Sequence, residues 1–268
     1  MNKIFFAQTS NGVNKKNLVL GVDIGGSKIN VVVFDGKKII DSWQPNEVNL
    51  ENLKNGISRF NIKKIGIGMA GVLDYKSGCV LNSPNLKLFE GLCFKKFLNK
   101  NVRFDNDVNC FLRAEAKLGA AKGYKNYLAV AMGTGIGGAI IVNMQSILGS
   151  HGSAGEFGFM IIENGKTWEK LYQETGPASG YPNPEKQKQI HAFGFANLIN
   201  IFDPKIIVLG GGGAILPNQE LMEKLILSPL AKKTKIVFGK LGLNATAIGA
   251  ALLWSNNKMA LKLKIINK

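Results

Sequence analysis

The stretch Asp23-Ile24-Gly25-Gly26-Ser27-Lys28 joins two largely apolar runs, residues 18–24 and 29–34. Such runs separated by a glycine pair predict two strands connected by a tight turn. A hairpin signal, Asp35-Gly36, follows the second run and precedes a further strand pattern at 38–42. The first part of the chain is therefore expected to form a three-stranded meander, with the carboxylate of Asp23 beside its first turn.

A second glycine turn repeats this arrangement. A strand pattern at 127–132 leads into Gly133-Thr134-Gly135-Ile136-Gly137-Gly138, and another strand pattern occupies 139–142. The glycines match the G-x-G-x-x-G fingerprint of dinucleotide-binding loops, but that fingerprint must open a helix, whereas residues 139–142 favour a strand. The two halves, each opening with a glycine-turned strand pair, predict an α/β fold of duplicated architecture.

The remaining patterns add helices and parallel strands after each meander. In the first half, a helical stretch around 47–60 precedes a strand at 65–69, and 102–104 is a short strand. Asp107 could cap a helix that carries apolar residues on one face. In the second half we expect helices at 189–202, 219–227 and 244–254, a strand at 205–209, and a strand-like alternation at 259–265.

Composition excludes several classes of protein. The chain has 268 residues, of which 46% are hydrophobic and 19% charged, so it is not mostly disordered. No apolar run approaches the roughly 20 residues that a membrane span needs, and Ile4-Phe5-Phe6-Ala7 is too short for a secretory signal, so a cytoplasmic protein is expected. The net charge of +16 comes almost entirely from dispersed Lys, which favours a solvated basic surface over a nucleic-acid site.

The three cysteines, Cys79, Cys93 and Cys110, lie far apart in the sequence and form no C-x-x-C pair. An odd number without paired spacing indicates neither a disulfide framework nor a cysteine-rich metal site. Three buried thiols are therefore expected.

Five motifs, taken in order along the chain, resemble those of one family: DIGGSK (23–28), FDNDVN (104–109), GTGIGGAI (133–140), GSHGSAGEFG (149–158) and VLGGGG (208–213). From Leu18 to Leu253 the chain resembles the ROK family of sugar kinases and related repressors, within the actin-like ATPase superfamily. The resemblance implies a two-domain, ribonuclease H-like α/β fold with nucleotide and sugar in the cleft between the domains. Residues 1–107 plus 244–268 would form the N-terminal domain, and residues 108–243 the C-terminal domain.

The resemblance also implies an activity, the ATP-dependent phosphorylation of a hydroxyl on a hexose or an amino or N-acetyl hexose. Asp107 would be the general base that takes the proton of the attacking hydroxyl, and Asp23 would hold the magnesium ion through water. Tight glycine turns suit this chemistry because they bring backbone N–H groups to phosphate oxygens. The residues implied for phosphate and nucleotide are Asp23, Gly25, Gly26, Ser27, Lys28, Gly133, Thr134, Gly135, Gly211 and Gly212, and those for sugar are Gly71, Asn85, Asn106, Asp107, Glu156 and Glu169.

The sequence departs from the family pattern where relatives carry a structural zinc. Phe159 stands at the position of the usual His, and no Cys occurs after Cys110, so we expect the protein to fold without zinc. Phe159 is expected to pack as an apolar plug that holds the Glu156 loop by burial. His151 is left open between a surface residue and a sugar contact, whereas His191 is expected to be an ordinary residue of a helix.

Two other functional classes stay open. One is a non-catalytic, sugar-responsive regulator, although the roughly 17 residues before the first strand leave no room for the helix-turn-helix domain of family repressors. The other is a basic nucleic-acid binder, which predicts steeply salt-dependent binding. Polyphosphate as the donor in place of ATP also suits a basic surface. The expected partners are a small-molecule sugar and a nucleotide, with no membrane, nucleic acid disfavoured and a homodimer left open.

Overall fold

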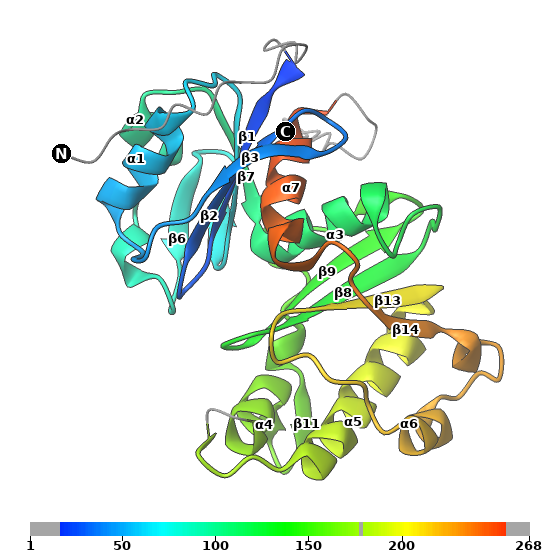
Figure 1. The fold of residues 1–268 in the computed structure, drawn as a ribbon. Helices are drawn as coiled ribbons and strands as arrows, with labels where there is room; N and C mark the ends of the chain where they lie inside the picture. The colour runs from blue at the N-terminus through cyan, green and yellow to red at the C-terminus, as the bar shows by residue number, and fades with distance from the viewer. Residues whose placement is uncertain (1–16, 177–178, 256–268) are drawn as a thin grey trace.

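The first of two five-stranded sheets contains the predicted meander. A computed structural model describes residues 17–176 and 179–255 (Figure 1). Its first sheet has the order β3-β2-β1-β4-β7, in which β1 to β3 are antiparallel and β4 and β7 run parallel to β1. The strands are β1 (Val19–Ile24), β2 (Ile29–Phe34), β3 (Ile39–Trp43), β4 (Ile65–Met69) and β7 (Val102–Asn106).

The second sheet has the same design. Its order is β10-β9-β8-β13-β14, again an antiparallel meander followed by two strands parallel to the first. The predicted α/β fold of duplicated architecture is therefore what the chain forms. The strands are β8 (Tyr127–Met132), β9 (Ile136–Val142), β10 (Gln145–Ser146), β13 (Ile206–Gly210) and β14 (Lys235–Phe238).

Helices surround the two sheets, and two short hairpins complete the described part of the chain. The α-helices are α1 (Leu50–Arg59), α2 (Phe94–Leu98), α3 (Asp107–Leu118), α4 (Trp168–Thr175), α5 (Pro184–Phe202), α6 (Gln219–Leu225) and α7 (Ala245–Ala251). Short 3-10 turns span Lys87–Phe89, Phe157–Phe159, Ala231–Lys233, Gly242–Asn244 and Leu252–Trp254. The hairpins are β5 (Val72–Asp74) with β6 (Cys79–Asn82), and β11 (Ile161–Glu163) with β12 (Lys166–Thr167).

Several boundaries differ from the sequence expectation for local reasons. The helix expected at 47–60 begins at Leu50, because the Asn49 side chain accepts the Asn52 N–H and caps it. Asn106, not Asp107, is the N-cap of α3, since its side chain accepts from the N–H groups of Val108 and Asn109. The strand-like tail at 259–265 lies outside the described residues.

Two helices lie between the sheets. In Figure 1, α7 packs on the first sheet and α3 lies between α7 and the second sheet. Close packing of α7 depends on glycine: a Cβ on Gly21 of β1 or Gly66 of β4 would collide with the α7 backbone at Ala247 or Ala250. The first turn of α3 packs equally closely on α7, since a Cβ on Gly249 would collide with the Cys110 backbone.

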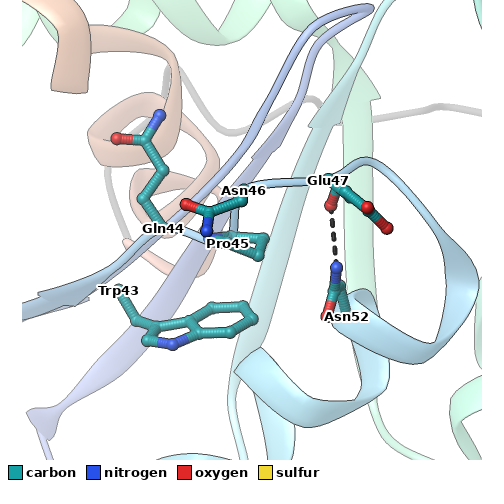
Figure 2. Close-up of a pocket in the computed structure, with 6 residues that line it drawn as sticks. All are labelled: Trp43, Gln44, Pro45, Asn46, Glu47 and Asn52. Atoms are coloured by element: carbon teal, nitrogen blue, oxygen red, sulfur yellow. Dashed lines mark hydrogen bonds between the residues drawn. The ribbon is translucent and has the colours of Figure 1, made fainter.

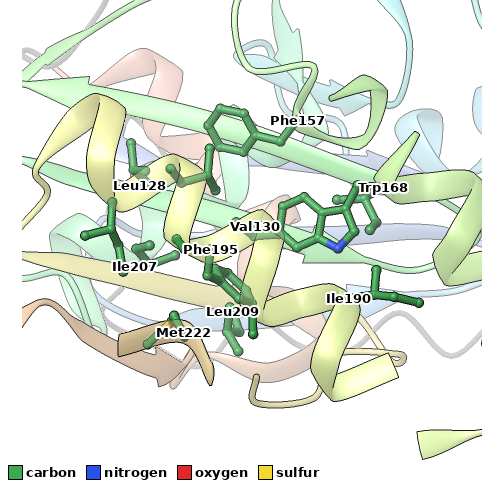
Figure 3. Close-up of a cluster of buried hydrophobic side chains, with 14 of the residues drawn as sticks. Leu128, Val130, Phe157, Trp168, Ile190, Phe195, Ile207, Leu209 and Met222 are labelled. Atoms are coloured by element: carbon green, nitrogen blue, oxygen red, sulfur yellow. The ribbon is translucent and has the colours of Figure 1, made fainter. Parts of the chain in front are cut away.

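A hydrophobic core lies on the face of the second sheet that is opposite α3, under α4, α5 and α6. Trp168 and Phe195 are fully buried there, and their rings meet edge to face with centroids 5.2 Å apart (Figure 3). Val130 and Leu209 reach the same cluster from the sheet. This core fixes α4 against the second glycine turn.

The expectation of three free thiols is wrong for one pair. Cys79 and Cys93 form a disulfide, because β6 and the segment before α2 meet as an antiparallel bridge at these two residues. That pairing is a tertiary contact, which the spacing of the cysteines in the sequence does not reveal. Cys110 is a free, buried thiol as expected, and burial raises its pKa.

Over residues 17–176 and 179–255, no helix combines the length and apolar character that a membrane crossing requires.

Candidate active site

The candidate site begins where the parallel strands of the first sheet end. Ile24 pairs with Met69, and Met69 pairs with Asn106, so the carboxyl ends of β1, β4 and β7 lie side by side. Asp23 is therefore brought near Asp107, the residue that follows β7. In α/β sheets, ligands bind at this edge of the strands.

Asp107 is the first residue of α3, and a buried network supports it. Asp105 is fully buried and forms an ion pair with Arg113, which lies nearly two turns into α3. The Tyr75 hydroxyl donates to Asp105 Oδ1 at 2.9 Å, which ties the β5–β6 hairpin to the same point. Asn106 Nδ2 lies 3.4 Å from the Gly71 carbonyl, so two predicted sugar-binding residues also meet here.

The carboxylates of the site influence one another. Burial raises the pKa of Asp107 to about 6, and the charge of Glu156 adds to the shift. Burial also raises the pKa of Asp23 to about 7; the charge of Asp107 adds to this shift, and that of Lys28 opposes it. Glu156 has a raised pKa as well, mainly through burial and then through the charge of Glu169. Four predicted site carboxylates thus share one electrostatic environment.

The first glycine turn connects β1 to β2 beside Asp23. The Gly25 N–H donates to the Lys28 carbonyl at 2.9 Å and closes the turn. Gly26 and Ser27 are exposed, and a Cβ placed on Gly26 would lie 3.7 Å from the Asn85 carbonyl. Asn85, predicted for the sugar rim, therefore lies close to the predicted phosphate turn.

The second and third glycine turns lie next to each other. Gly133 N–H donates to the Gly135 carbonyl at 2.9 Å, and the Gly213 N–H donates to the Met132 carbonyl at 3.0 Å. Gly211 has φ +85°, and a Cβ there would collide with the Met132 backbone, so only glycine fits. Gly212 faces open space. Two of the segments expected to bind the nucleotide are therefore adjacent.

Glu169 lies between the second turn and the Glu156 segment. Its Oε2 accepts the Ile136 N–H at 2.7 Å, and a Cβ on Gly135 would collide with its carboxylate. Gly158, two residues after Glu156, also packs on Glu169. Both predicted sugar-binding glutamates are thus held around the second turn.

The expected role of Phe159 is wrong. Phe159 is 64% exposed, whereas Phe157 is 5% exposed and packs on the second sheet at Gly138. The two residues belong to one 3-10 turn, and tertiary packing turns Phe157 inward. His191 is more than an ordinary helix residue, since its Nδ1 accepts the Trp168 indole N–H at 3.0 Å in the core. His151 is exposed.

A pocket of about 440 Å³ lies outside this site. It opens where β3 leads into α1, and the Asn52 side chain donates to the Glu47 carbonyl at its edge (Figure 2). None of the predicted site residues lines it; the lining residues are Trp43, Gln44, Pro45, Asn46, Glu47 and Asn52.

The residues of the site suit a magnesium nucleotide. The carboxylate of Asp107 raises the pKa of Asp23, a repulsion that a bound cation would relieve. Within the described residues, the N–H groups of Thr134 and Gly135 have no protein acceptor, so the second turn offers free donors for phosphate. No group of three His, Cys, Asp or Glu side chains in those ranges is arranged to hold a metal ion.

Helix α4, which contacts the second turn, was not expected from the sequence. Tyr172 and Gln173 of α4 donate to the carbonyls of Gly133 and Thr134, at 3.0 and 3.2 Å. The one signal in the sequence was their three- and four-residue spacing from Glu169, which places all three on one face of a helix.

Comparisons with known proteins show which sequences this chain resembles. The sequence profile described as "ROK family" matches residues 19–184. N-acetyl-D-glucosamine kinase of Pectobacterium atrosepticum is 29% identical over 301 aligned positions, which include 87% of this chain and 97% of that protein. The alignment is longer than the chain itself, so this relative carries internal segments that the chain lacks.

Solved structures share the fold. A ROK family glucokinase from Streptomyces griseus, in complex with glucose and AMPPNP, has a TM-score of 0.71 at 23% identity, covering 88% of this chain and 98% of that one. A ROK hexokinase from Thermus thermophilus has a TM-score of 0.68 at 24% identity, covering 88% and 97%. The expected actin-like ATPase fold is therefore confirmed.

Proposed function

Because this chain belongs to the ROK family, we propose that it transfers the γ-phosphate of ATP to a hydroxyl of a hexose or an amino or N-acetyl hexose. The similarity to an N-acetyl-D-glucosamine kinase, which extends over most of both chains, supports a carbohydrate kinase of this class. The sugar and nucleotide would enter between the two halves of the site, one centred on Asp107 and the other on the glycine turns.

The observation that carries this proposal is the position of Asp107. It starts a buried helix at the carboxyl edge of the first sheet, and its pKa of about 6 leaves it mostly ionised at neutral pH yet able to accept a proton. A sugar hydroxyl hydrogen-bonded to this carboxylate would lose its proton to it as the oxygen attacks the γ-phosphorus.

The glycine turns would bind the donor. The free N–H groups of Thr134 and Gly135 would bond phosphate oxygens, and the Gly211–Gly213 turn would lie against adenosine. Asp23 would hold magnesium through water, and the ion, when bound, supplies positive charge that offsets the phosphates. Lys28, whose charge lowers the pKa of Asp23, would add to that charge.

The acceptor would be recognised by carboxylates, which accept hydrogen bonds from sugar hydroxyls, and by amides, which both donate and accept them. Asn106, Glu156 and Glu169 surround Asp107 and the second turn, and Gly71 and Asn85 complete the rim on the first sheet. Sugars carry many hydroxyl groups, so a ring of carboxylates and amides suits them.

A coupled ADP-release assay over hexoses, hexosamines and N-acetylated hexoses tests the function. We expect one group of sugars to give magnesium-dependent turnover and the others to give little. Each sugar is also measured by calorimetry, and inorganic polyphosphate replaces ATP in a parallel series. Sugar binding without turnover on either donor would instead support the regulatory class, and binding of neither sugar nor nucleotide would refute the proposal.

A further inference from the structure

Helix α4 holds the second glycine turn through three side chains of one face. Glu169 accepts the Ile136 N–H, the Tyr172 hydroxyl donates to the Gly133 carbonyl, and the Gln173 amide donates to the Thr134 carbonyl, at 2.7, 3.0 and 3.2 Å. Each peptide group from Gly133 to Ile136 thus has at least one polar atom bound, and the Gly135–Ile136 group has both, because the Gly135 carbonyl also accepts the Gly133 N–H.

These bonds determine where the remaining donors point. In a trans peptide, the C=O and N–H groups point in opposite directions, and the described residues contain no cis peptide. The carbonyls of Gly133 and Thr134 are directed at α4, so the N–H groups of Thr134 and Gly135 are directed away from it. These two amides are the free donors of the turn.

Tyr172 is well suited to hold the second glycine turn. It is 5% exposed, and burial raises the pKa of its hydroxyl, which therefore stays protonated and able to donate. A Cβ on Gly213 would collide with the same hydroxyl, so Tyr172 also touches the third glycine turn. One side chain of α4 therefore contacts both turns assigned to the nucleotide.

The helix itself is anchored in the core. Trp168, its first residue, is fully buried and donates its indole N–H to His191 Nδ1 on α5 at 3.0 Å. A Cβ on Gly194 would lie 2.5 Å from the Trp168 ring, so α4 and α5 are in close contact. The Thr167 side chain caps α4 by accepting the Lys170 N–H. An anchored helix can hold the mobile backbone of a glycine turn in one orientation.

We propose that Tyr172 and Gln173 are positioning residues of the donor site, which hold the Gly133–Ile136 turn so that the Thr134 and Gly135 amides face the phosphates of the nucleotide. The inference rests on the proposed function in that it takes the ligand of this turn to be a nucleoside triphosphate. Neither side chain needs to touch that ligand itself.

Calorimetry with Mg·AMPPNP and with adenosine tests the inference. Tyr172→Phe keeps the buried ring but removes the hydroxyl and its hydrogen bond to the Gly133 carbonyl, so we expect about threefold to tenfold weaker binding of AMPPNP. Gln173→Ala should weaken it about twofold, because this bond is exposed to water. Adenosine, which has no phosphates, should bind all variants equally. Tyr181→Phe, a change at a side chain that is 89% exposed, is the matched control.

A second measurement needs no ligand. Backbone NMR order parameters of Thr134 and Gly135 should fall in Tyr172→Phe and stay at the wild-type value in Tyr181→Phe, because only the first change frees the turn. This readout separates positioning from a general loss of stability, which thermal unfolding of the same samples would reveal.

The outcomes are distinguishable. Unchanged AMPPNP affinity in the Tyr172→Phe, Gln173→Ala double variant would overturn the inference, and so would an equal loss for adenosine. A wild-type protein that binds AMPPNP but phosphorylates no sugar would refute the proposed function while the AMPPNP series still decides the inference. A wild-type protein that binds no AMPPNP would overturn both.

Discussion

Replacing Asp107 with Asn is expected to remove phosphoryl transfer without unfolding the protein. The amide has nearly the shape of the carboxylate, and its oxygen can still accept the Val108 N–H, which now lies 3.0 Å from Asp107 Oδ1. Asn106 continues to cap α3. What is lost is the proposed general base, and general-base catalysis contributes roughly 10²- to 10⁴-fold to a rate. We expect turnover to fall by that factor.

The pH dependence supplies a second, independent signature of the same group. Burial raises the pKa of Asp107 to about 6, so the carboxylate is mostly ionised at pH 7 and mostly protonated at pH 5. Since the ionised form is the base, kcat/KM of the wild type should fall about tenfold per pH unit below pH 6. The residual rate of Asp107→Asn should decline less steeply, because only Asp23, whose pKa burial raises to about 7, still titrates in this range.

The coupled assay, run from pH 5 to pH 8 on the best sugar, measures both effects. Asp203→Asn is the control, because it makes the same change at an exposed residue and Asn tolerates the left-handed conformation there, φ 42°. Calorimetry with AMPPNP should show nearly unchanged affinity in both variants. An Asp107→Asn protein that keeps at least a tenth of the wild-type kcat and the same acid limb would refute the assignment of the base.

Three further predictions follow from individual residues. Asp23→Ala should lose magnesium-dependent turnover while sugar binding by calorimetry persists; equal loss of both would point to a structural role for Asp23. Elemental analysis should find well under one zinc per chain, and chelator should leave the melting temperature unchanged, because the region after Cys110 contains no cysteine. Burial lowers the pKa of His191 from 6.5 to about 4, so its contribution to stability is complete above pH 6.5 and is lost as the pH falls toward 4, by about 3 kcal/mol at most. Urea unfolding at pH 4.5 and pH 7 should show this difference in the wild type and a smaller one in His191→Gln; equal differences would locate the titrating group elsewhere.

The two meanders could be predicted because their signals are local. Apolar runs and glycine pairs place β1, β2 and β8 within about one residue of their observed ends, and the strand expected at 139–142 lies inside β9. Parallel pairing then brings Asp23 and Asp107 to one edge of the sheet, although they are far apart in the sequence. Much of the candidate site follows from these facts.

The disulfide and the burial of Phe157 in place of Phe159 could not be predicted, because tertiary contacts determine both. Phe157 and Phe159 are the same residue type, two positions apart. Phe157 is buried and Phe159 is exposed because the 3-10 turn packs on Gly138 with the Phe157 side chain inward. Cys79 and Cys93 become neighbours only when β6 and the segment before α2 meet. Local patterns carry no information about such contacts.

Helix α4 is an element of the candidate site that local sequence patterns do not predict. It has only eight residues, too few to be stable alone, so its formation depends on the burial of Trp168 and Tyr172 in the core. The side of α4 that faces the second glycine turn carries Glu169, which we propose for the acceptor, and Tyr172 and Gln173, which we propose for the donor, all bonded to that turn. Since both side chains bond the same turn, a change in the turn that breaks the Tyr172 bond should also weaken the bond between Glu169 and the Ile136 N–H. Binding of sugar at Glu169 would then favour the turn orientation that binds phosphate, so affinity for AMPPNP should rise when the sugar is present, and less so in Tyr172→Phe.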